Sequence, residues 1–213
     1  MAIAERKFPA CVQGFESISR FWDVKHNVSA AKILPGEFYV TNSGEMITTV
    51  LGSCISACIR DTKYGFGGMN HFMLPGCNTN HTGNWSSAAS LETRFGVAAM
   101  ENLINEVLKL GGRKSNFEVK LFGGGDIMSM KSVSIGNRNI QFAMDFVSEE
   151  GLQIAAKDLG GPDPRKVMYF PATGKVLVKR LKSVQTAAIA AEETRYSSNF
   201  EEKSTGGSIE LFD

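Results

Sequence analysis

An alternating segment at residues 55–61 constrains the fold most directly. In ISACIRD, apolar and polar side chains follow one another with a period of two, which predicts a β-strand. The polar sequence DTKYG follows, and GFGGMNHFMLP then predicts a second strand that ends at Pro75. Two strands joined by a short polar link predict an antiparallel hairpin.

Both strands and helices are expected along the rest of the chain. A turn at Pro35–Gly36 precedes a strand that ends at Thr41. Further strands are expected at residues 46–51, 118–122, 152–158, 166–170 and 175–181, and the last two form a hairpin across PATG. Apolar spacings of three and four predict helices at 92–110 and 138–150, with glycines after them. Residues 186–191 are alanine-rich and form a third candidate helix.

Size and charge narrow the class of protein. The 213 residues suffice for one domain core, and the net charge of +1 argues against a nucleic-acid or anionic-membrane binder. No apolar run reaches the roughly 20 residues that span a bilayer, and the N-terminus does not resemble a secretion signal. We therefore expect a cytoplasmic protein whose four cysteines (Cys11, Cys54, Cys58 and Cys77) are free thiols.

The chain divides into three parts by composition. Residues 1–30 mix aromatic and polar side chains without a clear period and are expected to form an N-terminal extension. Residues 31–182 contain the predicted strands and helices and form the domain. Residues 183–213 form a polar tail that ends in a short apolar hook, IELFD, which either docks or is an unstructured end.

The predicted hairpin brings a thiol and an imidazole together. With Thr62 and Lys63 at its tip, Cys54 lies opposite His71, and opposed residues have Cβ atoms about 4.5–5.5 Å apart. The pairing depends on register, because a slip by one residue sends the two side chains to opposite faces.

A paired cysteine and histidine predict nucleophilic catalysis. The thiolate attacks a carbonyl carbon, and the imidazole transfers the proton to the leaving group. Gly52 and Ser53, directly before the cysteine, allow close approach of a substrate, and the backbone N–H groups there are candidate oxyanion donors. The alternative is that Cys54 and His71 are ordinary buried residues.

Two other kinds of site are less consistent with the sequence. Cys54, Cys58 and His71 suggest zinc, but two cysteines four residues apart on a strand are separated by about 13 Å, too far for one ion. The glycines at 123–125 follow a strand but lack the Lys-Ser/Thr of a phosphate loop, so a tight turn is the favoured interpretation.

Several short motifs occur along the domain. They are LGSC ending at Cys54, NHFMLP with His71, GGG at 123–125, IGNRN at 135–139, D-x-GG-x-x-x-R at 158–165 and TGKVLVKRL at 173–181. Together these motifs resemble the CheD-type chemoreceptor glutamine deamidases of bacterial chemotaxis, and the similarity runs from about residue 31 to 181.

The resemblance implies roles for particular residues. Cys54 matches the nucleophile of the family, His71 its base, and Thr48 the threonine that orients the histidine, because it lies six residues before the cysteine; Thr49 is its neighbour. Gly52, Ser53 and Asn70 are candidates for oxyanion or substrate support. No metal or organic cofactor is implied.

The resemblance also implies a fold and an activity. The expected fold is α+β, a layered α/β sandwich with two β layers and flanking helices, related to the deamidating domain of a cytotoxic necrotising toxin. The expected reaction converts glutamines in chemoreceptor cytoplasmic helices to glutamates, with methylester hydrolysis as an added activity and a CheC-type phosphatase as a second partner. Alternatives are a binding adaptor without catalysis and a small cysteine protease.

Overall fold

The chain folds as a mixed α+β sandwich. The structure, a computed structural model, describes residues 8–75, 85–127, 135–181 and 186–204. The strands are β1 (Ser19–Asp23), β2 (Val28–Lys32), β3 (Phe38–Thr41), β4 (Met46–Leu51), β5 (Ile55–Asp61), β6 (Phe66–Asn70), β7 (Phe117–Gly123), β8 (Gln153–Leu159), β9 (Arg165–Phe170) and β10 (Lys175–Arg180). The helices are α1 (Trp85–Lys109), α2 (Ile135–Glu149), α3 (Thr186–Ser204) and a short 3-10 turn, η1 (Lys114–Asn116).

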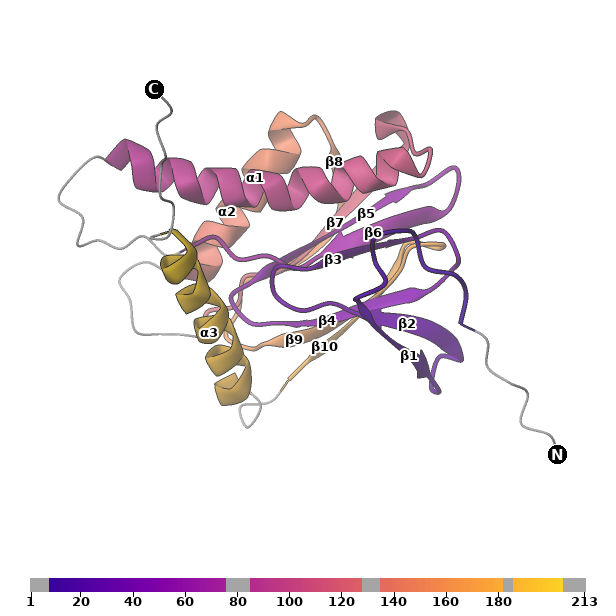
Figure 1. The fold of residues 1–213 in the computed structure, drawn as a ribbon, viewed down its shortest axis with the longest axis horizontal. Coiled ribbons are helices and arrows are strands. Elements are labelled where there is room, and N and C mark those ends of the chain that lie inside the picture. Colours follow the sequence, from indigo (N-terminus) through magenta and orange to yellow (C-terminus); the bar gives the residue numbers. More distant parts are fainter. Residues whose placement is uncertain (1–7, 76–84, 128–134, 182–185, 205–213) are drawn as a thin grey trace, which may run out of the picture.

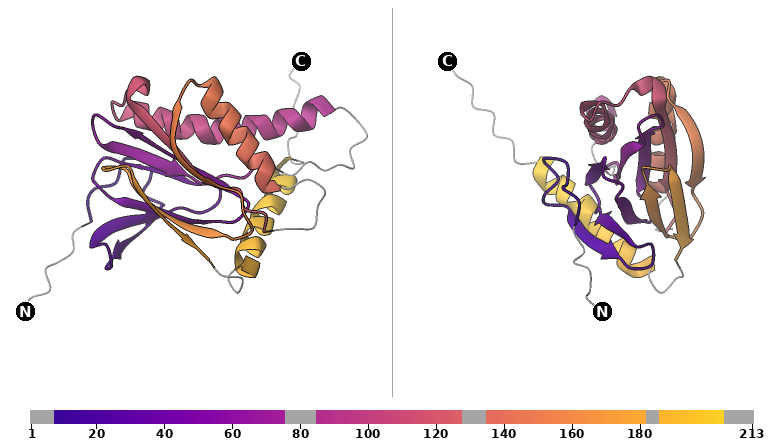
Figure 2. Two further views of the ribbon diagram at one scale, coloured as in Figure 1. Left: turned by 180° about the vertical axis from the view of Figure 1, so that it is seen from behind. Right: turned by 90° about the vertical axis from the view of Figure 1, so that its right-hand side faces the viewer.

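Two five-stranded sheets form the β layers. One has the order β1-β2-β4-β9-β10, and the other has the order β3-β6-β5-β7-β8. Figures 1 and 2 show the two sheets face to face, with α1 and α2 beyond the second sheet and α3 at one end of the sandwich. The expected sandwich with two β layers and flanking helices is therefore confirmed.

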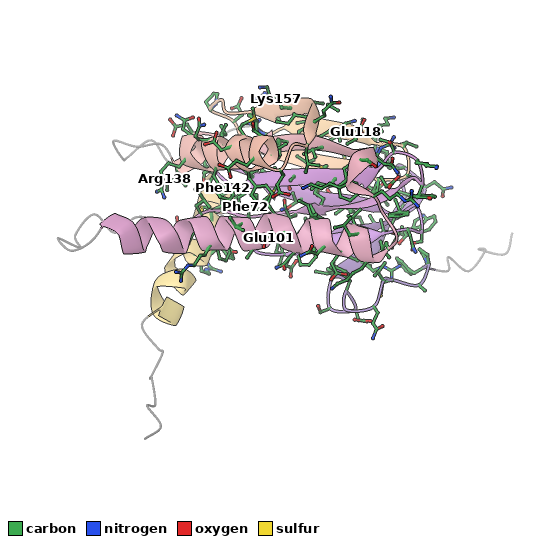
Figure 3. The ribbon with its side chains drawn as sticks, turned by 90° about the horizontal axis from the view of Figure 1, so that it is seen from above. Phe72, Glu101, Glu118, Arg138, Phe142 and Lys157 are labelled. Carbon is green, nitrogen blue, oxygen red and sulfur yellow. The ribbon has the colours of Figure 1, made fainter. Side chains whose placement is uncertain are left out.

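The two long helices cover the outer face of the second sheet. α1 packs on β3, β5 and β6, whereas α2 packs on β5, β7 and β8. Seen from above in Figure 3, Phe72 and Phe142 lie between the two helices, with their rings edge to face and centroids 6.0 Å apart. Among the described residues, no helix is long and apolar enough to cross a membrane.

The predicted strands agree closely with the observed ones. The strand at 46–51 has the observed bounds of β4, and the predicted hairpin at 166–181 is β9–β10, paired from Phe170 with Lys175 to Arg165 with Arg180. Gly36 has a positive φ of 86°, as the predicted turn requires. The predicted helices at 92–110 and 138–150 are α1 and α2, and each begins earlier than predicted.

The N-terminal region differs from the expected extension. β1 lies within the predicted extension, and β2 crosses its predicted boundary at residue 30. β2 continues the first sheet by pairing in parallel with β4. Short strands with partly exposed faces give a weak periodic signal, so the sequence pattern did not reveal them.

The β5–β6 hairpin has a different register from the predicted one. Cys58 pairs with Met69, and Ile55 bridges to Phe72, so the pairing is displaced by two residues from Cys54 opposite His71. The cause is a longer turn at residues 62–65. It is stabilised by Asp61, whose carboxylate accepts hydrogen bonds from the backbone N–H groups of Lys63 and Tyr64. Because side chains alternate with period two, this displacement leaves Cys54 and His71 on the same face.

The C-terminal region contains a longer helix than predicted. α3 begins at the expected residue, Thr186, but continues to Ser204. Several predicted features lie wholly or largely outside the described residues. They are the loop predicted after Pro75, which contains Cys77, the linker at 205–208 and the hook at 209–212.

A buried carboxylate connects the two sheets at one edge. Glu45, just before β4, is an ion-pair partner of Arg20 on β1 at 2.7 Å. It also accepts hydrogen bonds from Ser29 on β2 at 2.8 Å and from Tyr39 on β3 at 2.6 Å. β1 and β2 belong to one sheet and β3 to the other. A buried charge with this many donors is well compensated, whereas its removal leaves Arg20 without its counter-charge.

We expect Glu45→Ala to lower the free energy of unfolding by about 3 kcal/mol, because Arg20 and Tyr39 lose a buried partner. Urea unfolding followed by tryptophan fluorescence measures the change. Glu106→Ala is the matched control, since it removes a surface ion pair with Lys109 that contributes less than about 1 kcal/mol. Equal unfolding midpoints for the two variants would contradict this account of Glu45.

Candidate active site

The predicted nucleophile lies where the chain passes from one sheet to the other. Gly52, Ser53 and Cys54 connect β4 of the first sheet with β5 of the second. All three residues are buried. We call residues 52–54 the cysteine loop.

The carbonyl groups of the cysteine loop are held by hydrogen bonds from one side. The N–H of Gly125 donates to the carbonyl of Gly52 at 2.7 Å, and that of Gly124 donates to the carbonyl of Cys54 at 2.7 Å. The Asn139 amide on α2 donates to the carbonyl of Ser53 at 2.8 Å. Because every carbonyl is fixed, the orientation of the peptide groups is fixed as well.

The triple glycine is therefore a tight turn with close packing, as predicted. Gly123 and Gly124 have φ values of 113° and 67°, in a region that other residues rarely adopt. A Cβ atom at Gly123 would lie 2.1 Å from the Cys54 carbonyl oxygen. The glycines allow a backbone to donate directly to the cysteine loop.

The N–H groups of the same loop converge on a carboxylate from α3. Glu193 Oε1 accepts hydrogen bonds from Gly52 N at 2.9 Å and from Cys54 N at 3.2 Å. Glu193 Oε2 accepts from Ser53 N at 2.9 Å and from the Ser53 hydroxyl at 2.6 Å. Successive N–H groups that point to one place form an anion-binding concavity. The predicted oxyanion donors thus already hold an anion from the chain itself.

The imidazole of His71 is oriented by a threonine. Thr49 Oγ1 donates to the carbonyl of Ile33 at 2.8 Å and lies 2.8 Å from His71 Nδ1. The hydroxyl has only one hydrogen, so it accepts from His71, and Nδ1 carries the ring proton. His71 Nε2 is then the basic nitrogen, and it is a buried atom with no hydrogen-bond partner among the described residues.

The threonine beside His71 is Thr49 rather than the predicted Thr48. The Thr48 hydroxyl donates instead to the carbonyl of Val167 at 2.9 Å, on β9. Neighbouring residues of a strand point to opposite faces, so only one of the two can face the histidine. The observed contact favours Thr49 as the residue that orients the imidazole, whereas the spacing to the cysteine favours Thr48, and which threonine acts in the reaction stays a prediction.

The cysteine, the histidine and the carboxylate form one buried cluster. Their ligand-type atoms, one each from Cys54, His71 and Glu193, all lie within 4.8 Å of one another. A cysteine, a histidine and a carboxylate are a donor set that Zn²⁺ accepts. The Glu193 oxygens, however, are already engaged by four donors of the cysteine loop. This arrangement favours an anion site over a metal site. Cys58, the other cysteine considered for zinc, is not part of this group.

Burial keeps Cys54 and His71 uncharged in this state. Burial raises the pKa of Cys54 well above its usual value, and the Glu193 carboxylate raises that pKa further. Burial lowers the pKa of His71 to about 4, although Glu193 opposes the decrease. At neutral pH the pair is a thiol and a neutral imidazole.

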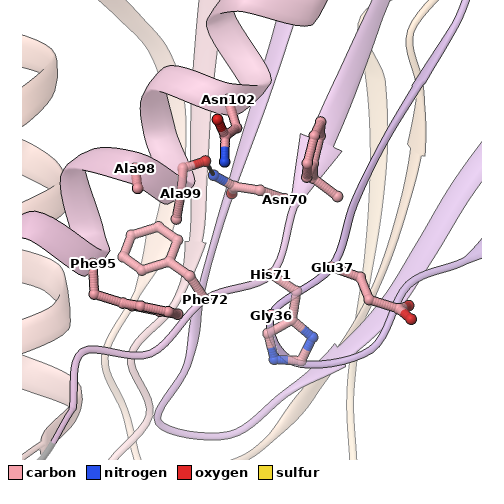
Figure 4. A pocket seen from close by; sticks show the side chains of 10 residues that line it. Gly36, Glu37, Asn70, His71, Phe72, Phe95, Ala98, Ala99 and Asn102 are labelled. Atoms are coloured by element: carbon pink, nitrogen blue, oxygen red, sulfur yellow. Dashed lines mark hydrogen bonds between the residues drawn. The ribbon is translucent and has the colours of Figure 1, made fainter. Parts of the chain in front are cut away.

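Asn70 is placed differently from the expected substrate support. Its side chain accepts from the Ala57 N–H at 2.8 Å and donates to the Ala99 carbonyl on α1 at 3.0 Å. Figure 4 shows this amide turned to α1, whereas the His71 ring points away from the helix. Both residues line a cavity of about 110 Å³ between α1 and the edge of the second sheet. Asn70 thus connects β5, β6 and α1.

The motif at residues 158–165 holds the glycine turn that contacts the cysteine loop. Arg165, fully buried, forms an ion pair with Asp158 and donates to the carbonyl of Gly160. The N–H of Gly160 in turn donates to the carbonyl of Gly123 at 2.9 Å. This ion pair therefore connects β8 and β9, from different sheets, to the glycine turn that holds the cysteine loop.

Sequence reasoning did not find three residues of the site. Asn139 lies within IGNRN, so the motif was noted but its contact was not. Thr49 was noted only as the neighbour of Thr48. Glu193 carried no signal, because an acidic residue on a polar helix ordinarily faces solvent.

Known proteins of similar sequence show the family to which this chain belongs. The family model described as CheD chemotactic sensory transduction matches residues 73–180. A protein of Halorhodospira halophila named probable chemoreceptor glutamine deamidase CheD is 49% identical over 207 residues, covering 96% of this chain and 94% of its own length. A protein of the same name in Hydrogenovibrio crunogenus is 50% identical over 190 residues, covering 89% and 97%.

The fold and site thus define an α+β sandwich with a buried cysteine–histidine pair at the junction of its two sheets. The chain belongs to the CheD family, as the matched family model and relatives of nearly full length show. The resemblance drawn from the motifs is confirmed.

We expect Gly123→Ala to lower the free energy of unfolding by at least about 3 kcal/mol, because the methyl group adds a collision with the Cys54 carbonyl to the backbone strain. Gly111→Ala is the matched control. Gly111 has a φ of 93° with nothing within 4 Å of its added Cβ, so it reports the strain alone, about 1–2 kcal/mol. Thermal and urea unfolding measure both variants, and equal losses would contradict the assigned contact.

Proposed function

We propose that this protein deamidates glutamine side chains of chemoreceptors, with Cys54 as the nucleophile and His71 as the base. The single observation that carries the proposal is the state of His71. One ring nitrogen is held by Thr49, and the other, Nε2, is buried without a partner among the described residues, in a cluster with the Cys54 sulfur. An unpartnered basic nitrogen beside a thiol is the arrangement that general-base activation requires.

The reaction proceeds in two stages. His71 Nε2 takes the thiol proton as Cys54 Sγ attacks the carboxamide carbon, and a tetrahedral oxyanion forms. The proton passes to the amide nitrogen, ammonia leaves, and a thioester remains on Cys54. His71 then takes a proton from water, which attacks the thioester, and returns this proton to the departing Cys54 thiolate. The products are the free thiol, ammonia and a carboxylic acid, which ionises to glutamate by giving its proton to ammonia.

The N–H groups of the cysteine loop are the proposed oxyanion donors. The N–H groups of Ser53 and Cys54 are fixed before the reaction begins, because the carbonyls of the same peptides, those of Gly52 and Ser53, are bonded to Gly125 and Asn139. Donors that need no reorganisation stabilise a developing negative charge most strongly, and loss of one such donor typically costs about 10²–10³ in rate. The proposed chemistry needs no metal or organic cofactor.

The substrate and partners follow from the names of the relatives. They are called chemoreceptor glutamine deamidases, so we propose receptor cytoplasmic helices as the partner of this chain and the cytoplasm as its location. Binding to a CheC-type phosphatase and hydrolysis of glutamate methyl esters are two further proposals, and both rest on the family resemblance. A buried base beside a buried thiol favours an enzyme over a pure adaptor.

The first test is ammonia release from a purified receptor cytoplasmic fragment by the wild type and by Cys54→Ala. We expect Cys54-dependent release, with a gain of about one dalton per modified glutamine and no cleavage of the chain. Chain cleavage would favour the protease alternative. Absence of ammonia while both forms still bind the fragment would overturn the deamidase proposal and favour the adaptor.

The two threonines provide a second prediction. We expect Thr49→Val to lower kcat by about 10–100-fold, because Val keeps the shape but removes the acceptor that fixes the His71 tautomer. Thr48→Val, which loses only the bond to the Val167 carbonyl, is the control and is expected to keep kcat within about threefold. The opposite order of the two effects would restore the sequence-based assignment of Thr48.

A further inference from the structure

The helix α3 meets the site with one narrow face. Its less exposed residues are Thr186, Ile189, Ala190, Glu193, Tyr196 and Ser197, a helical spacing that defines a single stripe. Only Glu193 on this stripe is fully buried. The neighbouring residues Glu192 and Thr194 are exposed. Within residues 186–197, α3 therefore presents one fully buried side chain, Glu193, to the cysteine loop, and about half of these residues are exposed.

A second residue of α3 fixes the position of the helix over the site. Tyr196, one turn after Glu193, packs on Gly36, where an added Cβ would lie 2.4 Å from the tyrosine oxygen. Gly36 in turn donates its N–H to the carbonyl of His71 at 2.8 Å. The two α3 residues thus cover the cysteine loop and the backbone of the histidine together.

The Glu193 side chain has the structure of the product of the proposed reaction. Deamidation of a glutamine leaves a glutamate whose carboxylate carbon is the former carboxamide carbon. Glu193 is such a glutamate, on a helix, with its carboxylate in the N–H concavity and in the cluster with Cys54 and His71. A carboxylate accepts hydrogen bonds at both oxygens, whereas a carboxamide accepts at only one. The observed donors consequently fit a product better than a substrate.

We propose that α3 occupies the binding site of the substrate helix, with Glu193 at the position of the reacting glutamine, so that the receptor helix must displace α3 before deamidation. This inference rests on the proposed deamidase function. It identifies the surface beside the cysteine loop as a helix-binding site, and it makes α3 an intramolecular competitor.

The electrostatics of the cluster agree with a resting state. The Glu193 carboxylate disfavours the negative thiolate, which raises the pKa of Cys54 beyond the effect of burial. A substrate glutamine is neutral and lacks this effect. Replacement of Glu193 by a carboxamide would therefore remove a charge that opposes formation of the nucleophile.

The first experiment compares Glu193→Ala with Glu192→Ala in the full-length chain. Both variants remove one negative charge from the same helix, but only Glu193 contacts the cysteine loop. We expect Glu193→Ala to raise the rate of Cys54 alkylation by iodoacetamide at least about tenfold, because the thiol loses both its cover and a charge that opposes the thiolate. Peptide mass spectrometry locates the modified cysteine. Equal rates in both variants would overturn the competitor role.

The second readout is ammonia release from the receptor fragment. If α3 leaves the site open in about one molecule in ten, Glu193→Ala raises kcat/KM about tenfold, and Glu192→Ala leaves it unchanged. A folded Glu193→Ala variant as inactive as Cys54→Ala would overturn the inference and make Glu193 catalytic. If alkylation rises but no form of the protein releases ammonia, α3 still covers the cysteine loop, whereas the deamidase proposal fails.

Glu193→Gln tests the position of the reacting side chain. In this variant Cys54 Sγ displaces ammonia from the introduced carboxamide, and water restores the thiol and leaves glutamate. We expect a gain of about one dalton at residue 193, absent in the Cys54→Ala/Glu193→Gln double variant. An unchanged mass in a chain that still deamidates the receptor fragment would overturn the product-like assignment of Glu193.

Discussion

The site depends on one constraint, which is that the two peptide groups between residues 52 and 54 are held at both ends. The carbonyls of Gly52 and Ser53 accept hydrogen bonds from Gly125 and Asn139, and the N–H groups of the same peptides, those of Ser53 and Cys54, therefore point the other way, to Glu193. The glycine turn and α2 thus act on the chemistry without contact with a substrate. Elements distant in sequence, including the Arg165–Asp158 ion pair, serve to keep this one loop in place.

The location of the loop explains its burial and its electrostatics. A crossover between two packed sheets has protein on most sides, so the thiol and the imidazole are both desolvated. Their pKa values move apart, which leaves a neutral pair, and ionisation then depends on what lies in the N–H concavity. A single group from α3 is enough to alter that balance.

The sequence predicted the elements better than their connections. Strong alternation revealed β5 and the β9–β10 hairpin, but the N-terminal strands have no clear period and were missed. Asp61 lengthens the β5–β6 turn, so the predicted register was displaced, and Cys54 and His71 still share one face of the sheet because the displacement is even. The choice between Thr48 and Thr49 depends on which strand face meets the histidine, which a motif does not encode. Glu193 lies 139 residues after Cys54, and only the folded chain brings them together.

The Glu45 cluster has a consequence for how the two sheets form. Its carboxylate gathers Arg20 and Ser29 from one sheet and Tyr39 from the other. A half-formed sandwich would bury this charge with only part of its partners, at a cost of several kcal/mol. Neither sheet can therefore complete this edge alone, and we infer that the two sheets fold and unfold as one cooperative unit, with the cysteine loop assembled only when both are present.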